Sequence, residues 1–114
     1  MIPFNNRFHG HSSLKYVYQN GQAVRSHSIV IKTAPNLHRK QSRVAVVVGK
    51  KILKSAVRRN FIRRRIYEYV RAKLPHINGV YDIVIIVSSG EMLTVSYQEM
   101  TDQLDQLFSQ TGIL

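Results

Sequence analysis

Ten of the 17 basic side chains in this 114-residue sequence lie between Lys50 and Lys73, where Glu68 is the only acid. These ten are Lys50, Lys51, Lys54, Arg58, Arg59, Arg63, Arg64, Arg65, Arg71 and Lys73. From Arg58 to Lys73, arginine outnumbers lysine six to one. Because a guanidinium binds phosphate oxygens through paired hydrogen bonds and also stacks on bases, the cluster predicts a surface for structured nucleic acid rather than for membrane.

The alternative interpretation of this cluster is an ordinary solvated helix face. Such faces usually mix acidic with basic residues, whereas here like charges stand three and four residues apart and repel one another. A polyanion relieves that repulsion, so we favour nucleic-acid binding. Lys50, Lys51 and Lys54 form a basic approach to the helix, and the free N–H groups of a helix start also bind phosphate.

Carboxylates that might support catalysis are sparse. Glu99, Asp102 and Asp105 are spaced by three residues, which places them on one face of a helix. We expect this face to be solvated, with Glu99 also supporting the helix start. A metal-dependent nuclease needs clustered carboxylates, so we expect no catalytic residue in the protein.

Two other kinds of site are also disfavoured. The histidines show no recurrent metal-ligand spacing, so we predict no metal site from His9, His11, His27, His38 and His76. The segment Gly49-Lys50-Lys51 is similar to the end of a phosphate-binding loop, but Val44 stands where the first glycine of such a loop is required.

The charge is divided along the chain. Residues 1–73 hold every Lys and Arg and carry a net charge of +16, whereas residues 74–114 carry −5, which together make the net charge of +11. The absence of Cys excludes disulfides and suits a reducing compartment. The apolar runs are far shorter than the ~20 residues of a membrane span, and residues 1–10 have no signal-peptide core. We therefore expect one cytoplasmic domain over 1–114 that does not enter a membrane.

Periodicity predicts the elements that position these residues. In order they are a helix over 12–20, a β region over 23–33 with a break near 26–28, a loop over 35–41, a strand over 43–48, a helix from Ser55 to near Leu74, a strand over 81–88 and a helix from Ser96 to Gly112. The strand over 43–48 is continuously apolar after Arg43, which predicts cover on both faces. A strand, a long helix and a strand in succession predict a parallel pair joined by a crossover helix.

The first and last helices have amphipathic patterns. In the first, Leu14, Val17 and Tyr18 share a face, Ser12 or Ser13 is the expected cap, and Gly21 follows the end. In the last, Ser96 and Glu99 form a capping box. The apolar face of that last helix consists of Tyr97, Met100, Leu104, Leu107 and Phe108.

The long basic helix combines a core stripe with an outer face. The stripe consists of Ile62, Ile66, Tyr69 and Val70. At about 100° per residue the opposite side carries Asn60, Arg64, Tyr67 and Arg71, flanked by Arg63. Arg58, Arg59 and Arg65 border the stripe, so not all of them need be free.

The stretch Val48-Gly49-Lys50-Lys51, followed after seven residues by Arg59-Asn60-Phe61-Ile62-Arg63-Arg64-Arg65, resembles the signature of the protein subunit of bacterial ribonuclease P. The family's usual form is a Lys-Lys pair and then a helix that opens with Arg-Asn-Arg. The order of the predicted elements extends the resemblance over nearly the whole chain. This chain departs from the usual pattern at Phe61, which replaces the second arginine, at Leu14 and Tyr18 on the first helix, and at Lys32 in a strand.

The resemblance implies an α/β (α+β) sandwich of about four strands and three helices in the order α-β-β-β-α-β-α. In that fold the basic helix makes a left-handed crossover between parallel strands, whereas general topology rules predict a right-handed one. The implied function is to assist a catalytic RNA that removes the 5′ leader of precursor tRNA. The RNA holds Mg²⁺ and performs the hydrolysis, while the protein binds no cofactor of its own and joins the RNA in a 1:1 complex.

The resemblance also implies roles for individual residues. The catalytic RNA would contact Lys50, Lys51, Lys54, Arg58, Arg59, Arg63, Arg64, Arg65 and Arg71. The leader of precursor tRNA would contact Leu14, Tyr18, Lys32, Arg59, Asn60 and Arg63. Two residues keep a second interpretation: Tyr18 as a core aromatic, and Asn60 as a residue that only helps to cap the helix.

Two other functions remain as alternatives. One is a non-catalytic ribosomal or chaperone-type RNA-binding protein, and the other is a small nuclease that acts alone. Cleavage of precursor tRNA with and without the catalytic RNA distinguishes all three.

Overall fold

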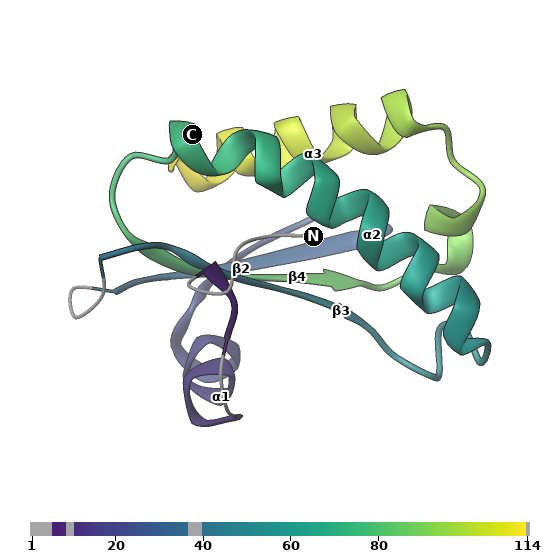
Figure 1. The fold of residues 1–114 in the computed structure, drawn as a ribbon, viewed down its shortest axis with the longest axis horizontal. Helices are drawn as coiled ribbons and strands as arrows, with labels where there is room; N and C mark the ends of the chain where they lie inside the picture. Colours follow the sequence, from purple (N-terminus) through teal and green to yellow (C-terminus); the bar gives the residue numbers. More distant parts are fainter. Residues whose placement is uncertain (1–5, 9–10, 37–39, 114) are drawn as a thin grey trace.

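The structure is a computed structural model that describes residues 6–8, 11–36 and 40–113, and these form an α+β fold (Figure 1). Its elements are α1 (His11–Asn20), β1 (Gln22–Arg25), β2 (Ile29–Pro35), β3 (Arg43–Val48), α2 (Ala56–Lys73), β4 (Tyr81–Val87) and α3 (Tyr97–Thr111). Two short 3₁₀ helices, η2 (Leu74–His76) and η3 (Gly90–Leu93), follow α2 and β4. The predicted order of helices and strands is confirmed.

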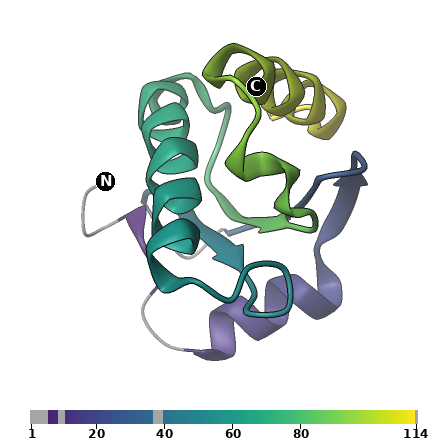
Figure 2. The same ribbon diagram turned by 90° about the vertical axis from the view of Figure 1, so that its right-hand side faces the viewer.

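The four strands make one mixed sheet in the order β1-β2-β4-β3. β2 pairs antiparallel with β1 and β4, whereas β3 pairs parallel with β4, with Val44 opposite Ile83 and Val46 opposite Ile85. Helix α2 joins this parallel pair. Viewed from the ends to which β3 and β4 point, with α2 above the sheet, β4 lies to the right of β3 (Figure 2). The crossover is therefore left-handed, against the general rule.

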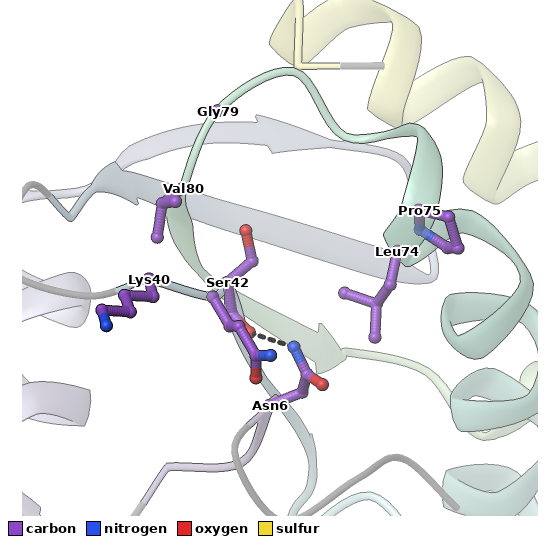
Figure 3. A pocket seen from close by; sticks show the side chains of 8 residues that line it. Asn6, Lys40, Ser42, Leu74, Pro75, Gly79 and Val80 are labelled. Carbon is purple, nitrogen blue, oxygen red and sulfur yellow. Dashed lines mark hydrogen bonds between the residues drawn. The ribbon is translucent and has the colours of Figure 1, made fainter.

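A short N-terminal segment borders the outer edge of β3. Asn6 Nδ2 donates to the carbonyl oxygen of Ser42 at 2.7 Å (Figure 3), and Arg7 makes a parallel bridge with Val44. This contact covers part of an edge that would otherwise present free backbone groups.

Capping side chains set the ends of the two long helices. Ser55 Oγ accepts from the N–H of Arg58 at 3.3 Å at the start of α2, and Ser96 Oγ accepts from the N–H of Glu99 at 3.1 Å at the start of α3. Helix α3 ends at Gly112, whose φ of 77° lies in the left-handed region that favours glycine. Both starts and both ends agree with the sequence prediction to within a residue or two.

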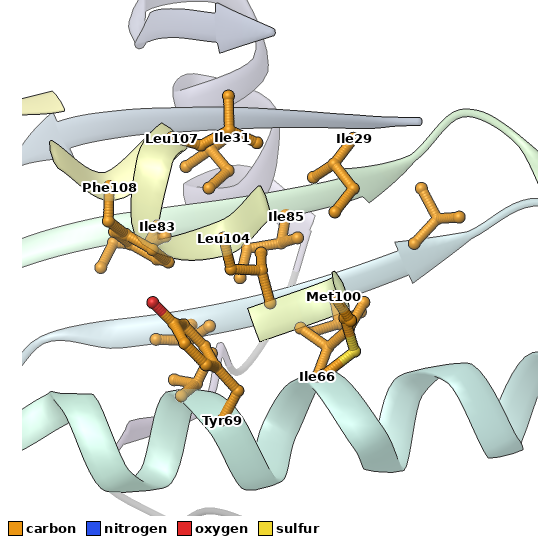
Figure 4. Packing of buried hydrophobic residues seen from close by; sticks show 14 of the residues in the cluster. Ile29, Ile31, Ile66, Tyr69, Ile83, Ile85, Met100, Leu104, Leu107 and Phe108 are labelled. Carbon is orange, nitrogen blue, oxygen red and sulfur yellow. The ribbon is translucent and has the colours of Figure 1, made fainter. Parts of the chain in front are cut away.

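Helices α2 and α3 cover one face of the sheet and enclose the main core (Figures 1 and 4). All four residues of the predicted stripe on α2 are buried: Ile62, Ile66, Tyr69 and Val70. From α3 the buried residues are Met100, Leu104, Leu107 and Phe108, as predicted. Tyr97 was assigned to that face wrongly: it is exposed, because it occupies the first turn of α3.

Helix α1 lies on the other face of the sheet (Figure 1). Val17 is buried there with Ala34 and Val84. This helix can turn sharply into β1 only because residue 21 is glycine: a Cβ at Gly21 would lie 2.6 Å from the carbonyl oxygen of Val17.

The predicted break in the β region over 23–33 is confirmed: β1 and β2 form a hairpin that turns at residues 26–28, where Ser26 N–H donates to Ile29 O at 2.8 Å. Two further expectations need correction. Strand β2 continues to Pro35, into the predicted loop. On the α1 side, β3 is only half covered, since Ala45 and Val47 are partly exposed.

Some expectations concern residues that the structure does not describe. The side chains of Ser12 and Ser13, proposed as caps, and residues 37–39 of the loop lie outside the described residues. Of the helices that are described, none is long and apolar enough to cross a membrane.

Candidate nucleic-acid interface

The outer side of α2 presents Asn60, Arg64 and Arg71 to solvent, as the helical geometry predicts. Tyr67 was assigned to this side wrongly. Its ring is partly buried against the core, and its hydroxyl accepts a hydrogen bond from the N–H of Val46 at 3.1 Å. A long aromatic side chain at this position reaches the edge of β3, so it satisfies an edge N–H instead of facing solvent.

Two arginines of α2 are held by backbone carbonyl groups. Arg59 Nη1 donates to Leu53 O at 2.9 Å and to Lys54 O at 2.8 Å, which fastens the approach loop to the helix. Arg65 donates to Met92 O at 3.2 Å and to Val95 O at 2.9 Å, which fastens the segment between β4 and α3. Part of the donor capacity of both side chains therefore serves the fold, as their position beside the core stripe indicated.

Three more cations of α2 have partners on the helices. Arg63 Nη2 donates to Asn60 Oδ1, and Arg71 pairs with Glu68 at 2.9 Å. Lys73 lies 3.4 Å from a carboxylate oxygen of Asp105 on α3. Asn60 is exposed and Ser55 is the helix cap, so the capping role considered for Asn60 is wrong.

Five of the predicted RNA-binding cations are exposed and, within the described part of the chain, make no side-chain hydrogen bond or ion pair. They are Lys50, Lys51, Lys54, Arg58 and Arg64. The lysines occupy the segment between β3 and α2, and the arginines lie in the N-terminal half of α2. Their charges therefore remain available for an anion along a continuous stretch of chain.

A shallow hollow on α2 borders Arg64, one of these five cations. Val57, Asn60, Arg63 and Arg64 line it, so its walls combine an apolar side chain, an amide and two guanidinium groups. This combination can receive a phosphate together with part of a sugar or base. The hydrogen bond from Arg63 to Asn60 orients both polar groups in the hollow.

Tyr18 and Lys32 meet on the opposite face of the sheet. Lys32 Nζ lies 5.2 Å from the centre of the Tyr18 ring and donates to the carbonyl oxygen of Tyr18 at 3.0 Å. Leu14 packs in the same cluster. Burial raises the pKa of Tyr18, yet the ring remains partly exposed. Tyr18 thus packs against the fold while one part of its ring faces solvent beside a cation.

This face contains an aromatic residue that the sequence analysis did not select. Phe8 packs in the cluster of Val17 and Tyr18, and its ring centre lies 4.7 Å from the guanidinium of Arg43. Arg43 is buried and forms two hydrogen bonds to Asp82, of 2.9 and 2.7 Å. The sequence did contain a signal for the pairing of Arg43 with Asp82. The two opposite charges stand near the starts of two apolar strands, and the strands pair with these residues opposite each other.

The structure does not gather the predicted leader-binding residues into one site. Leu14, Tyr18 and Lys32 lie on the α1 face of the sheet, whereas Arg59, Asn60 and Arg63 lie on α2, which covers the other face (Figure 1). Strand β3 forms the edge of the sheet next to α2. A ligand that touches both groups must therefore pass around this edge.

A second hollow lies at the other end of α2 (Figure 3). It is lined by Asn6, Lys40, Gln41, Ser42, Leu74, Pro75, Gly79 and Val80. Among the described residues that line it, none is a predicted site residue, and Lys40 is the one that carries a charge.

The acidic residues are dispersed and mostly paired. Asp82 pairs with Arg43, Glu91 with His27 and Glu68 with Arg71. Asp105 is exposed, as expected of the solvated face of α3, and also accepts a hydrogen bond from the Tyr69 hydroxyl at 2.5 Å between the two long helices. Among the described residues, no group of three or more His, Asp and Glu side chains has the arrangement of a metal site. His9, His38 and the side chain of His11 lie outside the described part of the structure.

The fold and this surface define a class of small basic α+β proteins in which exposed cations gather on the helix that joins two parallel strands and on the segment before it. The chain belongs to the ribonuclease P protein family, because the family model described as Ribonuclease P matches residues 2–112.

Individual relatives agree with this assignment. The ribonuclease P protein component of Synechocystis sp. is 29% identical over 113 residues, which are 99% of this chain and 90% of that protein. The corresponding protein of Chloroflexus aurantiacus is 31% identical over 98 residues, 86% of this chain and 71% of the relative. The solved structure of the Staphylococcus aureus RNase P protein has the same fold, with a TM-score of 0.84 at 23% identity, covering 95% of this chain and 96% of that one.

Proposed function

We propose that this protein is the accessory protein subunit of ribonuclease P, which assists an RNA-catalysed removal of the 5′ leader from precursor tRNA. The observation that carries the proposal is the run of five exposed, unpaired cations from Lys50 to Arg64 in a member of this family. Each cation that neutralises a phosphate releases counterions, so such a run favours a polyanion strongly at moderate salt.

In this proposal the two faces of the protein take different ligands. The cations of the approach loop and of α2 bind the phosphates of the catalytic RNA. The cluster of Phe8, Tyr18 and Lys32 on the α1 face binds the leader, where a single strand finds an aromatic surface beside a positive charge. For the leader also to contact Asn60 and Arg63 on α2, it must pass around the edge of the sheet at β3.

Hydrolysis is assigned to the RNA, which also holds the Mg²⁺ ions. The carboxylates of this chain support that assignment, because Glu68, Asp82, Glu91 and Asp105 are each paired to a cation or a hydroxyl. The protein contributes affinity and orientation by holding RNA and substrate together in a 1:1 complex.

A cleavage assay tests the proposal. The purified protein is added to precursor tRNA at low Mg²⁺ concentration, with and without the catalytic RNA from the same genome. We expect cleavage at the leader junction that is strongly stimulated by the protein and that requires the RNA. Cleavage by the protein alone would indicate a self-sufficient nuclease. A protein that binds RNA but does not stimulate cleavage would indicate a ribosomal or chaperone-type protein.

A further inference from the structure

Phe61 is an exposed aromatic residue on the most basic helix of the protein. Arg58 lies three residues before it, and Arg64 and Arg65 lie three and four residues after it. At these spacings all three are its neighbours on the helix surface. Ile62, the next residue, is fully buried and supplies the core contact at this point of the helix. Phe61 is 42% exposed. The family usually has an arginine at this position.

Arg65 supports the Phe61 ring from one side. Its guanidinium carbon lies 5.4 Å from the ring centre, within the range of a cation–π contact. Two backbone carbonyls, Met92 O and Val95 O, hold the same guanidinium in place. Arg65 is therefore fixed by the fold, so it acts as a support that orients the ring more than as a free phosphate ligand.

We propose that Phe61 is a stacking contact for an unpaired base of the catalytic RNA, with Arg58 and Arg64 binding the phosphates on either side of that base. This inference rests on the proposed function and adds a residue to it. An aromatic ring accepts any base face, and the two flanking cations are exposed and make no ion pair in the described structure. A neutral apolar partner would leave both of these cations uncompensated, whereas a nucleotide matches the ring and the charges together.

Tyr97 provides a control for this site. It is an aromatic residue at the start of α3 and is 50% exposed. Unlike Phe61, it has no Lys or Arg within four residues of it in the sequence. Any general effect of an exposed ring on RNA binding should therefore appear at Tyr97 as well as at Phe61.

Binding of the full-length protein to the catalytic RNA tests the stacking contact. We expect Phe61→Ala and Phe61→Leu to weaken binding by about 5- to 150-fold, and Phe61→Tyr to retain it, because stacking requires the ring. The slope of log affinity against log salt should stay unchanged, since no cation is lost. Tyr97→Ala should bind like the unmodified protein, and thermal unfolding of every variant should verify that the fold is intact.

A fluorescence experiment gives an independent readout, because the chain contains no Trp. Phe61→Trp introduces a single indole whose emission should be quenched when the RNA binds and stacks on it. The emission of Tyr97→Trp, with its indole on α3, should be quenched much less.

Three results would overturn the stacking contact: unchanged affinity of Phe61→Ala, wild-type affinity of Phe61→Leu, or equal quenching at positions 61 and 97. If the unmodified protein does not bind the catalytic RNA at all, the proposed function itself fails, and this outcome is distinct from the other three.

Discussion

Arg64 and Arg71 lie two turns apart on α2 and differ in whether their charge is already paired. Arg64 is exposed and free of ion pairs in the described structure, whereas Arg71 pairs with Glu68. We predict that Arg64→Ala weakens binding of the catalytic RNA and lowers the salt slope by about 0.7 to 0.9, the value for one phosphate contact. Titrations over a series of salt concentrations measure both quantities.

Arg71→Ala is the control for this prediction, because it removes the same charge from the same helix. It should change the slope by much less, since the helix already balances that charge. Equal changes for the two variants would contradict the distinction between paired and unpaired arginines.

Tyr18 and Tyr16 provide a second comparison between single residues, on α1. Tyr18 is half buried beside Lys32, whereas Tyr16 is exposed and lies outside that cluster. We predict that Tyr18→Ala lowers the affinity for precursor tRNA with a leader by about 1 to 3 kcal/mol, if the ring stacks on a leader base. Tyr18→Phe and Tyr16→Ala should retain affinity.

The same titrations with mature tRNA complete this test. Equal losses for substrates with and without a leader would show that Tyr18→Ala damages the packing of α1 instead of a leader contact. Thermal unfolding of Tyr18→Ala measures that packing contribution directly.

At the scale of elements, α2 and α3 are joined by a buried aromatic contact. The ring of Tyr69 stacks against Phe108 with ring centres 6.1 Å apart, and its hydroxyl donates to Asp105. Burial, and then the hydrogen bond to Asp105, raise the pKa of Tyr69 far above its ordinary value of 10.0. The two helices therefore pack most favourably while this hydroxyl keeps its proton.

The raised pKa predicts how stability depends on pH. Above pH 10 the unfolded chain releases the Tyr69 proton and the folded chain retains it, so rising pH favours the unfolded state. This group should lower the free energy of unfolding by about 1.4 kcal/mol per pH unit in that range. We predict that Tyr69→Phe makes the decline less steep by this amount, as measured by urea unfolding between about pH 11 and about pH 12.

Tyr16→Phe is the control for the pH experiment, because Tyr16 is exposed on α1. Tyr16→Phe should leave unchanged the rate at which the free energy of unfolding declines with pH. If Tyr69→Phe and the unmodified protein lose stability equally at high pH, the Tyr69 hydroxyl does not stabilise the contact between α2 and α3.

At the scale of the whole molecule, the five unpaired cations lie on α2 and the segment before it, whereas exposed acids lie on α3. If these five cations each neutralise one phosphate, the plot of log affinity for the catalytic RNA against log salt should have a slope of about −4. Acidic side chains on α3, such as Asp102, lie on a different helix from these cations and are exposed.

We predict that Asp102→Asn changes RNA affinity by less than about twofold, although it alters the net charge as much as Arg64→Ala does. A binding titration at fixed salt measures the difference. A several-fold tightening by Asp102→Asn would show that α3 also faces the RNA and would contradict the separation.

Much of the fold follows from local patterns in the sequence. Ser55 and Ser96 begin the long helices because their hydroxyls accept the first free N–H groups, and the spacing of Ile62, Ile66 and Tyr69 selects the buried side of α2. The parallel pairing of β3 and β4 follows from a helix placed between two apolar strands. The left-handed sense of that crossover was expected only from the family resemblance, because the general rule predicts the opposite sense.

The sequence by itself determined where the cations are and that they lie on one helix with its approach, because charge and periodicity are properties of the chain. Only the tertiary structure decided which of them are free. Arg59 and Arg65 are held by carbonyl groups on segments that periodicity does not relate to α2, and Tyr67 meets the edge of β3. The positions of these partners do not follow from any periodic pattern in the sequence. Only tertiary packing therefore divides the cations of the +16 region into those that hold the fold together and those that remain for RNA.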